Sequence, residues 1–295
     1  MHQLAAPDAR ANQLADVAPR IRALVRGGHS TIDAALIAQL PALEIIANFG
    51  VGYDSIDLAA AARGIIVTNS PGVLTEEVAD TALGLLLLTV RELSAAERHL
   101  RAGRWTTEGA YPLSPSMRDR TVGMVGMGRI GIAIARRLDA MHVPVVYHSR
   151  RARPDLPYRH YGNRREMATD VDTLMAIVPG TAATRNLIDA EILGALGPNG
   201  AFINVIRGTV VDQAALIAAL KNRTILAAGL DVFADEPHVP AELVALPNAV
   251  LLPHVGSASV HTRKAMGQLV VDNVRSWFEH ATPITPVPET PWPRP

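Results

Sequence analysis

Three side chains in the second half of the chain, Arg207, Glu236 and His254, combine anion binding with proton transfer. They lie in the segments Asn204–Gly208, Asp231–Pro237 and Pro253–Ala258, each of which ends a short apolar run. Reduction of a 2-keto acid needs a hydride at C2 and a proton at the carbonyl oxygen. A histidine, which titrates near neutral pH, can supply the proton. A neighbouring carboxylate orients the ring and favours its protonated form. An arginine can bind the substrate carboxylate in a forked geometry and polarise the carbonyl.

Each of these residues also has an ordinary structural explanation when it is taken alone. A histidine after a proline at a strand end is more often structural than catalytic, an Arg-Gly pair is usually a turn, and a Glu-Pro pair usually bounds a helix or loop. Their joint occurrence favours a site, because ligands of an open α/β sheet bind outside the carboxyl ends of its strands, where all three segments would converge.

A G-x-G-x-x-G pattern precedes these segments and lies between a predicted strand, 121–125, and a predicted helix, 129–138. Its residues are Gly126, Met127, Gly128, Arg129, Ile130 and Gly131. Gly126 would permit the tight turn, Gly128 would let the backbone approach a pyrophosphate, and Gly131 would let the helix pack against the strand. The phosphates would lie at the helix N-terminus, which favours anions. The alternative is a glycine-rich turn without a ligand, and the flanking strands and helix argue against it.

The end of the next predicted strand, 143–147, bears on the choice of cofactor. NAD-dependent enzymes place Asp or Glu here to bind the ribose 2′-hydroxyl, whereas this chain has Ser149, Arg150 and Arg151. No carboxylate would repel a 2′-phosphate, and two guanidinium groups could bind it. The sequence therefore favours NADP(H) over NAD(H). The alternative is that these arginines, together with Arg153, are only solvated loop charges.

Strands and helices alternate over about 130 residues of this part of the chain, which predicts a doubly wound parallel sheet of Rossmann type. Further strands are predicted at 175–178, 201–205, 226–231 and 250–252, and further helices at 189–196 and 213–220. Before this part, strands are predicted at 43–47 and 65–67, no strand within 1–40, and one long helix at 75–102. After it, a helix at 259–280 precedes six prolines within the last 13 residues, which predict an extended tail.

Composition excludes several classes of protein. The 295 residues suggest two domains and carry no net charge, with 28 basic and 28 acidic residues, so no nucleic-acid partner is expected. The chain has no cysteine, its first 20 residues contain no signal peptide, and its most apolar run, Ala82–Val90, is too short to span a membrane. A cytoplasmic protein without a membrane partner is expected. The remaining histidines form no pair at metal-binding spacing, so no metal is expected.

From about Leu43 to Trp277 the sequence resembles the D-isomer-specific 2-hydroxyacid dehydrogenase family. The resemblance rests on the segments Gly50–Asp54, Gly126–Gly131, Asn204–Gly208, Asp231–Pro237 and Pro253–Ala258. Within the family, the loop Asn48–Gly52 and the Ser149-Arg150-Arg151 run look most like NADP-dependent glyoxylate/hydroxypyruvate reductases. The resemblance implies a Rossmann cofactor domain, residues 73–260, and a smaller flavodoxin-like α/β substrate domain built from 1–72 and 261–295, with the proline-rich tail at 282–295.

The resemblance also implies roles for individual residues. His254 would be the general acid/base, Glu236 its partner, and Arg207 a ligand of the substrate carboxylate and carbonyl. Backbone N–H groups of Val51 and Gly52 would bind the carboxylate from the smaller domain. Asp231 would accept a hydrogen bond from the nicotinamide carboxamide. The remaining residues implied at the cofactor are Pro179, Thr184 and Gly256. The long helix after Gly72 and the loop around Trp105 would build a homodimer interface.

Two features depart from the family pattern. Ile206 precedes the arginine where the family usually has a small residue, which could crowd the substrate or nicotinamide and shift specificity. The part before Gly50 is short, so either the substrate domain lacks an element or the sequence starts downstream of the true start.

Three functions stay open: an NADPH-dependent 2-keto acid reductase, an NAD-dependent enzyme of phosphoglycerate or lactate dehydrogenase type, and a nucleotide-sensing scaffold without catalysis.

Overall fold

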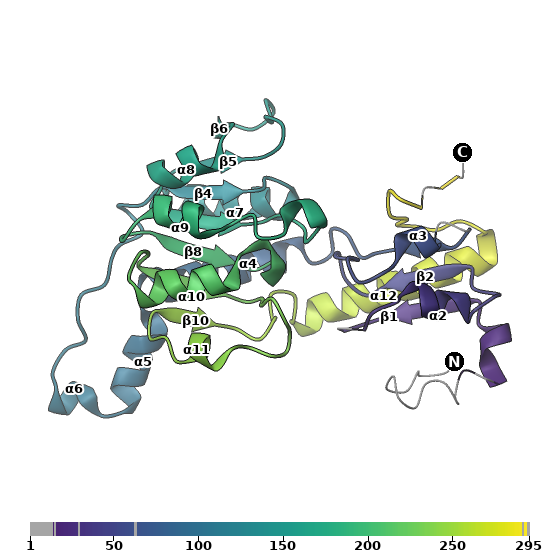
Figure 1. The fold of residues 1–295 in the computed structure, drawn as a ribbon, viewed down its shortest axis with the longest axis horizontal. Coiled ribbons are helices and arrows are strands. Elements are labelled where there is room, and N and C mark those ends of the chain that lie inside the picture. The colour runs from purple at the N-terminus through teal and green to yellow at the C-terminus, as the bar shows by residue number, and fades with distance from the viewer. Residues whose placement is uncertain (1–13, 15, 29, 62–63, 291, 294–295) are drawn as a thin grey trace. The chain divides into compact units, whose positions relative to one another are not determined.

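The computed structural model describes residues 14, 16–28, 30–61, 64–290 and 292–293. The chain forms two compact units: a small unit of Met1–Leu74 with Val260–Pro295, and a large unit of Thr75–Ser259 (Figure 1). Within the described residues, no helix is both long enough and apolar enough to cross a membrane. Most of the N-terminal segment in which no signal peptide was expected lies outside the described residues.

The large unit is built on seven parallel strands in the order β10–β9–β8–β7–β4–β5–β6. The strands are β4 (Val122–Val125), β5 (Val145–His148), β6 (Arg159–Tyr161), β7 (Thr173–Ala176), β8 (Ala201–Asn204), β9 (Ala227–Leu230) and β10 (Ala249–Leu251). The chain winds outward in both directions from β4 and β7, so the point where the strand order reverses lies between these two strands. The predicted doubly wound Rossmann sheet is confirmed, and β6 is a short edge strand that the sequence did not reveal.

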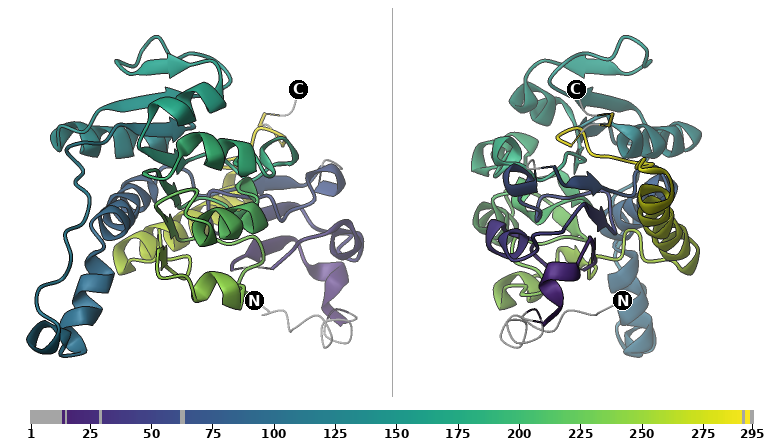
Figure 2. Two further views of the ribbon diagram at one scale, coloured as in Figure 1. Left: turned by 60° about the vertical axis from the view of Figure 1, so that its left-hand side comes forward. Right: turned by 90° about the vertical axis from the view of Figure 1, so that its right-hand side faces the viewer.

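Helices cover both faces of this sheet (Figure 2). On one face, α4 (Thr75–Val90) packs against α7 (Arg129–Ala140), and on the other, α9 (Ala190–Leu196) packs against α8 (Arg164–Asp170) and α10 (Gln213–Lys221). Side-chain caps fix where two of these helices begin. Asp189 accepts a hydrogen bond from the N–H of Ile192, and Asp212 accepts one from Ala215. The shorter helices are α5 (Leu93–Arg101), α6 (Arg104–Thr107), η2 (Ala182–Thr184), η3 (Gly208–Val210) and α11 (Ala241–Val244).

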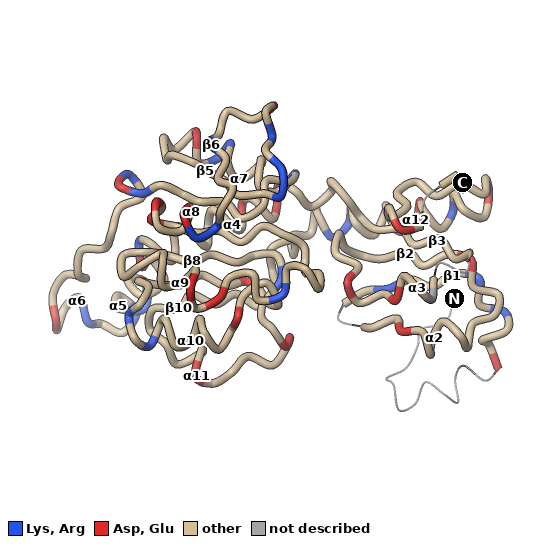
Figure 3. The backbone as a smooth tube through the Cα atoms, turned by 45° about the horizontal axis from the view of Figure 1, so that its top comes forward, with Lys and Arg blue, Asp and Glu red and all other residues tan. Residues whose placement is uncertain are grey.

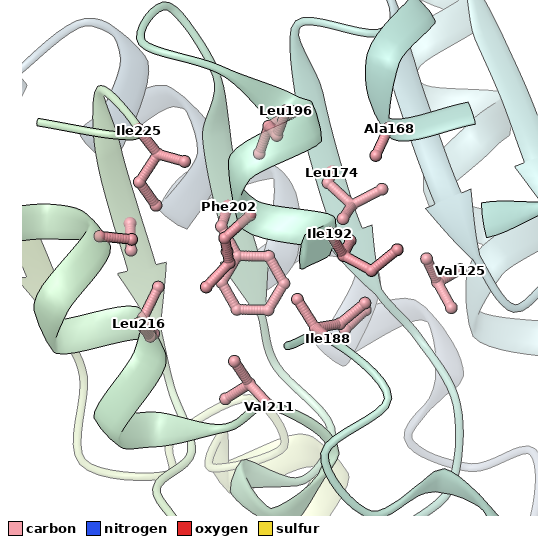
Figure 4. Packing of buried hydrophobic residues seen from close by; sticks show 14 of the residues in the cluster. Val125, Ala168, Leu174, Ile188, Ile192, Leu196, Phe202, Val211, Leu216 and Ile225 are labelled. Carbon is pink, nitrogen blue, oxygen red and sulfur yellow. The ribbon is translucent and has the colours of Figure 1, made fainter. Parts of the chain in front are cut away.

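A buried apolar cluster fills the space between the sheet and the α9–α10 layer (Figure 4). Phe202 of β8 is fully buried at its centre, with Ile188, Ile192, Val211 and Leu216 around it. Aliphatic side chains supply nearly all of this core, as the scarcity of aromatic residues requires. The cluster packs against the strands and so fixes the positions of their carboxyl ends.

The prediction of one helix over 75–102 is wrong, because the helix stops after α4 and restarts as α5. Glu92 adopts a left-handed backbone conformation with a φ of 52°, which an α-helix cannot continue through. Its carboxylate accepts a hydrogen bond from the Tyr111 hydroxyl, 2.7 Å away. Helix propensity is continuous across this break, so it does not predict where α4 ends. The break coincides with the contact between Glu92 and Tyr111.

The small unit contains a second parallel sheet, of three strands in the order β1–β2–β3. Its elements are η1 (Ala18–Arg20), β1 (Ala23–Arg26), α2 (Ala34–Ala38), β2 (Ile45–Asn48), α3 (Leu58–Ala61), β3 (Ile66–Thr68) and α12 (Val260–His280). The prediction of a smaller α/β unit from both chain ends is thus matched by parallel strands and helices. Its core includes Leu36, Ile37, Ile46 and Val67.

The prediction that residues 1–40 contain no strand is wrong. β1 pairs with β2 through all four of its residues, from Ala23 with Ile45 to Arg26 with Asn48. Because β1 is an edge strand whose residues are half-buried or exposed, it has neither a long apolar run nor a clear alternation. The small unit therefore has the first strand that the sequence analysis missed.

The C-terminal tail packs on β3 of the same unit. Thr68 and Pro286 form an antiparallel bridge, and Val287 is buried and donates its N–H to the carbonyl of Val67. The hydroxyl of Thr290 accepts a hydrogen bond from the Val67 N–H at 2.9 Å. The described part of the proline-rich tail is thus bound to the small unit, with a turn between Val287 and Thr290.

Candidate active site

His254 and Glu236 form a close pair at the carboxyl edge of the large sheet. His254 Nδ1 lies 2.6 Å from Glu236 Oε2, with 38% of the histidine side chain and 15% of the glutamate side chain exposed. The other carboxylate oxygen, Oε1, accepts the N–H of Phe233 at 2.9 Å. Because the carboxylate accepts from Nδ1, the proton on that nitrogen is fixed, and Nε2 is the ring nitrogen that would exchange a proton with a substrate.

Asp231 holds the backbone on either side of this histidine in place. Its two carboxylate oxygens accept the N–H groups of Val255 and Gly256, each at 2.7 Å, and its carbonyl accepts the N–H of His254 at 2.9 Å. His254 has a left-handed φ of 53°, a strained conformation that the three hydrogen bonds stabilise. Burial raises the pKa of the Asp231 carboxyl above its ordinary value, and the two N–H donors act against that rise.

Arg207 follows β8, and the buried side chain of Asn204 shapes the turn that presents it. The Asn204 amide donates to the carbonyl of Arg207 at 2.9 Å, and its oxygen accepts the N–H of Ile206 at 3.2 Å. The Arg207 guanidinium donates to the carbonyl of Ile206 at 2.7 Å through Nη1. Arg207 is half-buried, so its guanidinium can reach a small anion at this edge.

Close approaches between glycines and neighbouring loops show that the strand ends lie side by side. A Cβ on Gly208 would lie 1.9 Å from the carbonyl carbon of Phe233, so the loop carrying Arg207 touches the loop carrying Glu236. A Cβ on Gly180 would lie 2.9 Å from the Cγ of Arg207. These contacts bring the loops of Arg207 and Glu236 together at the edge of the sheet where Glu236 pairs with His254, as the sequence predicted.

The fingerprint turn has the form that a pyrophosphate requires. Gly126 has a left-handed φ of 103°, and a Cβ there would lie 2.4 Å from the carbonyl oxygen of Ile177. A Cβ on Gly131 would lie 2.7 Å from the carbonyl oxygen of Gly126, whereas one on Gly128 would meet nothing within 4 Å. The space in front of Gly128 is therefore open, next to the N-terminus of α7.

The first N–H groups of α7 complete this cradle. Among the described residues, none accepts a hydrogen bond from the backbone N–H of Arg129, Ile130 or Gly131. Unsatisfied N–H groups and the helix dipole favour an anion at this position. The residues present thus fit a dinucleotide.

The arginines in the loop between β5 and β6 differ in their contacts. Figure 3 shows the basic residues of this region in blue. Arg150 and Arg151 are exposed and form no ion pair with any residue that the structure describes. Arg153 instead pairs with Asp155 at 2.6 Å and donates to the carbonyl of Met127 at 3.3 Å. The Ser149 hydroxyl donates to the carbonyl of Arg151 at 2.6 Å, which shapes the turn.

The loop after β7 is closed on itself. The hydroxyl of Thr184 donates to the carbonyl of Pro179 at 2.6 Å and accepts the N–H of Thr181 at 2.8 Å. Contacts of Pro179, Thr184 and Gly256 with a cofactor stay predictions. Across the described part of the chain, no group of three or more His, Asp or Glu residues is arranged to hold a metal ion.

Val51 and Gly52, the predicted carboxylate ligands, lie in the small unit, in a loop that follows β2. Two asparagines that the sequence analysis did not assign shape this loop. Asn48 donates to the carbonyl oxygens of Gly50 and Gly52 at 2.9 and 3.0 Å, and Asn69 donates to that of Val51 at 2.8 Å. An asparagine at a strand end before a glycine or proline turn, as also seen at Asn204, was the available signal.

A Rossmann-type sheet that carries a His–Glu pair and an arginine at its carboxyl edge defines a dinucleotide-dependent oxidoreductase. Residues 83–256 match the sequence profile of the D-isomer specific 2-hydroxyacid dehydrogenase NAD binding domain. The chain belongs to the D-isomer specific 2-hydroxyacid dehydrogenase family.

Three relatives show how close the similarity is. The chain is 46% identical over 268 residues to glyoxylate/hydroxypyruvate reductase A HPR2 of Arabidopsis thaliana, across 90% of this chain and 85% of the relative. It is 43% identical over 275 residues to hydroxyphenylpyruvate reductase of Plectranthus scutellarioides, across 93% and 88%. The crystal structure of an NADPH-dependent glyoxylate/hydroxypyruvate reductase from Sinorhizobium meliloti, in complex with NADP and malonate, is 55% identical with a TM-score of 0.91, across 95% of this chain and 88% of that chain.

Proposed function

We propose that this protein reduces a small 2-keto acid of the glyoxylate/hydroxypyruvate class to the D-2-hydroxy acid with NADPH. The observation that carries the proposal is the 2.6 Å His254–Glu236 pair, whose glutamate lies on a loop that touches the one presenting Arg207. A pure nucleotide sensor has no need of such a proton-transfer pair. The names of the similar reductases agree with this substrate class.

The chemistry divides between the cofactor and this chain's own residues. NADPH, when bound, supplies the hydride that forms the new C–H bond at C2 of the keto acid. His254 Nε2 donates a proton to the carbonyl oxygen, which takes the electron pair of the C=O π bond. Glu236 keeps the ring oriented and stabilises the imidazolium before transfer. Arg207 binds the substrate carboxylate and polarises the carbonyl.

The preference for NADPH over NADH is part of the proposal. Arg150 and Arg151 are exposed beside the predicted ribose site, and the run Ser149-Arg150-Arg151 contains no carboxylate. The neighbouring Arg153 is already paired with Asp155. A 2′-phosphate would give the two arginines charge-assisted partners, whereas NADH would leave them as solvated cations.

The other cofactor and substrate contacts belong to the same proposal. Gly126, Gly128, Gly131 and the N-terminus of α7 would hold the pyrophosphate. Both carboxylate oxygens of Asp231 already accept backbone N–H groups, so a carboxamide would have to share one of them. Val51 and Gly52 would bind the substrate carboxylate.

We also propose a homodimer that acts in the cytoplasm. The segment from α5 to Leu113 exposes apolar side chains, with Leu100, Trp105 and Leu113 among the most exposed large hydrophobic residues. An apolar surface of this kind is typical of a protein interface. Sedimentation analysis tests the dimer, and a monomer at micromolar concentration would contradict it.

The decisive experiment assays the purified protein against glyoxylate, hydroxypyruvate and phenylpyruvate, with NADPH and NADH in parallel. We expect turnover with NADPH, and the D-isomer as the product from hydroxypyruvate and phenylpyruvate, whereas glyoxylate gives achiral glycolate. His254→Ala should lose turnover while it still binds NADPH, measured by quenching of protein fluorescence. Cofactor binding by the unaltered protein without turnover of any of these keto acids would refute the proposed reaction.

A further inference from the structure

The loop after β2 in the small unit has three consecutive backbone carbonyls turned toward side chains of its own unit. The Gly50 carbonyl accepts hydrogen bonds from the Asn48 amide and from the N–H of Ser70, both at 2.9 Å. The Val51 carbonyl accepts the Asn69 amide at 2.8 Å. The Gly52 carbonyl accepts the Asn48 amide at 3.0 Å.

The planar trans peptide links the direction of each of these carbonyls to that of the following N–H group. In each peptide unit the C=O and N–H groups point in opposite directions. Carbonyls held toward Asn48 and Asn69 therefore direct the N–H groups of Val51, Gly52 and Tyr53 away from them. Within the described residues, the N–H groups of Val51 and Gly52 have no hydrogen-bond acceptor. Successive backbone N–H groups without an internal acceptor are candidates for binding an anion.

A hydrogen bond from Arg26 fixes the orientation of the Asn48 side-chain amide. Asn48 is buried, and its side-chain oxygen accepts a hydrogen bond from Nη1 of Arg26 at 3.0 Å. Nη1 can only donate, so the oxygen must face Arg26 and the NH₂ group must face the two carbonyls. This residue is bound to the sheet and does not depend on the chain's C-terminal end.

Asn69 depends on the C-terminal tail instead. Its carbonyl accepts the hydroxyl of Thr285 at 2.6 Å, and its N–H donates to the carbonyl of Thr285 at 3.2 Å. Thr285 is held in turn by Asn273, a buried residue of α12. The Asn273 oxygen accepts the N–H of Thr285 at 3.0 Å, and its NH₂ group donates to the Thr285 hydroxyl at 2.9 Å. A continuous series of hydrogen bonds thus links α12, the tail, Asn69 and Val51.

A second contact joins the tail to the same loop. The Tyr53 hydroxyl donates to the carboxylate of Glu289, 3.1 Å away at Oε2. Tyr53 immediately follows Gly52, so the tail holds the loop on its far side as well. Tyr53 is therefore attached directly to the tail, and Val51 is attached to it through Asn69.

We propose that Asn69, held by Thr285 of the C-terminal tail, is a positioning residue for the recognition of the substrate carboxylate by Val51 and Gly52. This inference rests on the proposed function, in which these N–H groups bind the keto acid. Asn69 does not itself contact the substrate. It sets the orientation of the peptide between Val51 and Gly52, and the tail sets the position of Asn69.

The test compares Asn69→Ala with Thr285→Val, and uses Thr282→Val as the matched control. Thr282 lies in the same tail, but it is exposed, and among the described residues its hydroxyl hydrogen-bonds only to the carbonyl of His280. In Asn69→Ala we expect the KM for glyoxylate and the inhibition constant of oxalate to rise together by about tenfold, the loss of one charge-assisted hydrogen bond. The kcat and the dissociation constant of NADPH should change less than about twofold.

Thr285→Val should raise the same two constants by about threefold, because Asn69 keeps its amide but loses its anchor. Thr282→Val should match the unaltered protein. A merely structural role would lower the melting temperature without moving the oxalate constant. If Asn69→Ala does not fold, Thr285→Val decides the question.

Unchanged constants for glyoxylate and oxalate in the folded variants would overturn the inference and leave the proposed function intact. Failure of the unaltered protein to reduce any 2-keto acid with NADPH would instead refute the proposed function. In that case oxalate binding by the unaltered protein, weakened in Asn69→Ala, still supports the anion site, and equal binding overturns it.

Discussion

Replacement of Gly208 by alanine tests how tightly the strand-end loops of the large unit are packed. A Cβ at this position would lie 1.9 Å from the carbonyl carbon of Phe233, 2.0 Å from its oxygen and 2.5 Å from the nitrogen of Ala234. All three neighbours are backbone atoms, which cannot rotate out of the way as a side chain can. The two loops must therefore separate to admit the methyl group.

The size of the effect follows from these distances. Carbon atoms in contact normally lie about 3.5–4 Å apart, so the loops must move by more than about 1.5 Å. Overpacking usually costs about 1–3 kcal/mol, and a rigid backbone neighbour places Gly208→Ala at the upper end of that range. For a domain of this size, about 3 kcal/mol lowers the melting temperature by roughly 6–12 °C. Because Arg207 and Glu236 lie on the two loops, a displacement of this size should reduce kcat/KM by at least on the order of 100-fold.

Gly194→Ala is the matched control. This glycine lies within α9, is exposed, and a Cβ there would meet nothing within 4 Å. The same substitution should stabilise the protein by about 0.5–1 kcal/mol, since alanine favours the helix. Thermal unfolding and steady-state kinetics with NADPH and glyoxylate measure both variants. A Gly208→Ala protein as stable and as active as its parent would refute the packing described between the loops after β8 and β9.

Three further predictions concern the cofactor site and the buried carboxyl. Replacing Arg150 and Arg151 together by serine should raise the KM for NADPH by about 10–100-fold and leave the KM for NADH nearly unchanged, because only NADPH carries the 2′-phosphate. Gly128→Val should weaken NADPH binding at least about tenfold without lowering the melting temperature, since its side chain would enter open space in front of α7. Asp231→Asn should weaken the dependence of the free energy of unfolding on pH in the acid range. Burial raises the pKa of Asp231, so the folded protein holds this proton at pH values where the unfolded chain has lost it, and the free energy of unfolding falls as pH rises through that window.

Each of these has a result that contradicts it. Equal losses for NADPH and NADH in the double arginine variant would mean that the two arginines do not read the 2′-phosphate. Unaltered NADPH affinity in Gly128→Val, measured by fluorescence titration, would place the pyrophosphate elsewhere. For Asp231→Asn, urea unfolding between about pH 4 and 7 gives the slope, and a slope equal to that of the parent would show that Asp231 does not titrate in that range.

The predicted strands and helices of the large unit follow from local signals. Apolar runs at Val122–Val125 and Ala201–Asn204 are buried from end to end, and Gly126 adopts its left-handed turn without strain because it lacks a Cβ. Because parallel strands share one carboxyl edge, their order along the chain was enough to predict that the loops carrying Arg207, Glu236 and His254 converge there. The large unit and its site were therefore accessible from the pattern of residue types.

Elements without a local signal were missed. β1 has four residues at a half-exposed edge, and β6 has three, too few for any periodicity to show. The end of α4 at Glu92 depends on a left-handed residue that helix propensity does not reveal. In each case the deciding contact is with a residue elsewhere in the chain.

The amino-acid sequence by itself determined the Rossmann sheet and the fingerprint turn, because these depend on short-range patterns, and one rule of sheet geometry predicted the set Arg207, Glu236 and His254. Only the tertiary structure decided what holds the small unit's loop, because a hydrogen bond between Asn69 and Thr285 joins residues 216 positions apart. An asparagine and a threonine are common polar residues in sequence. Their role comes from backbone carbonyls that the fold brings within reach of them, and no pattern of residue types records the direction of a peptide group.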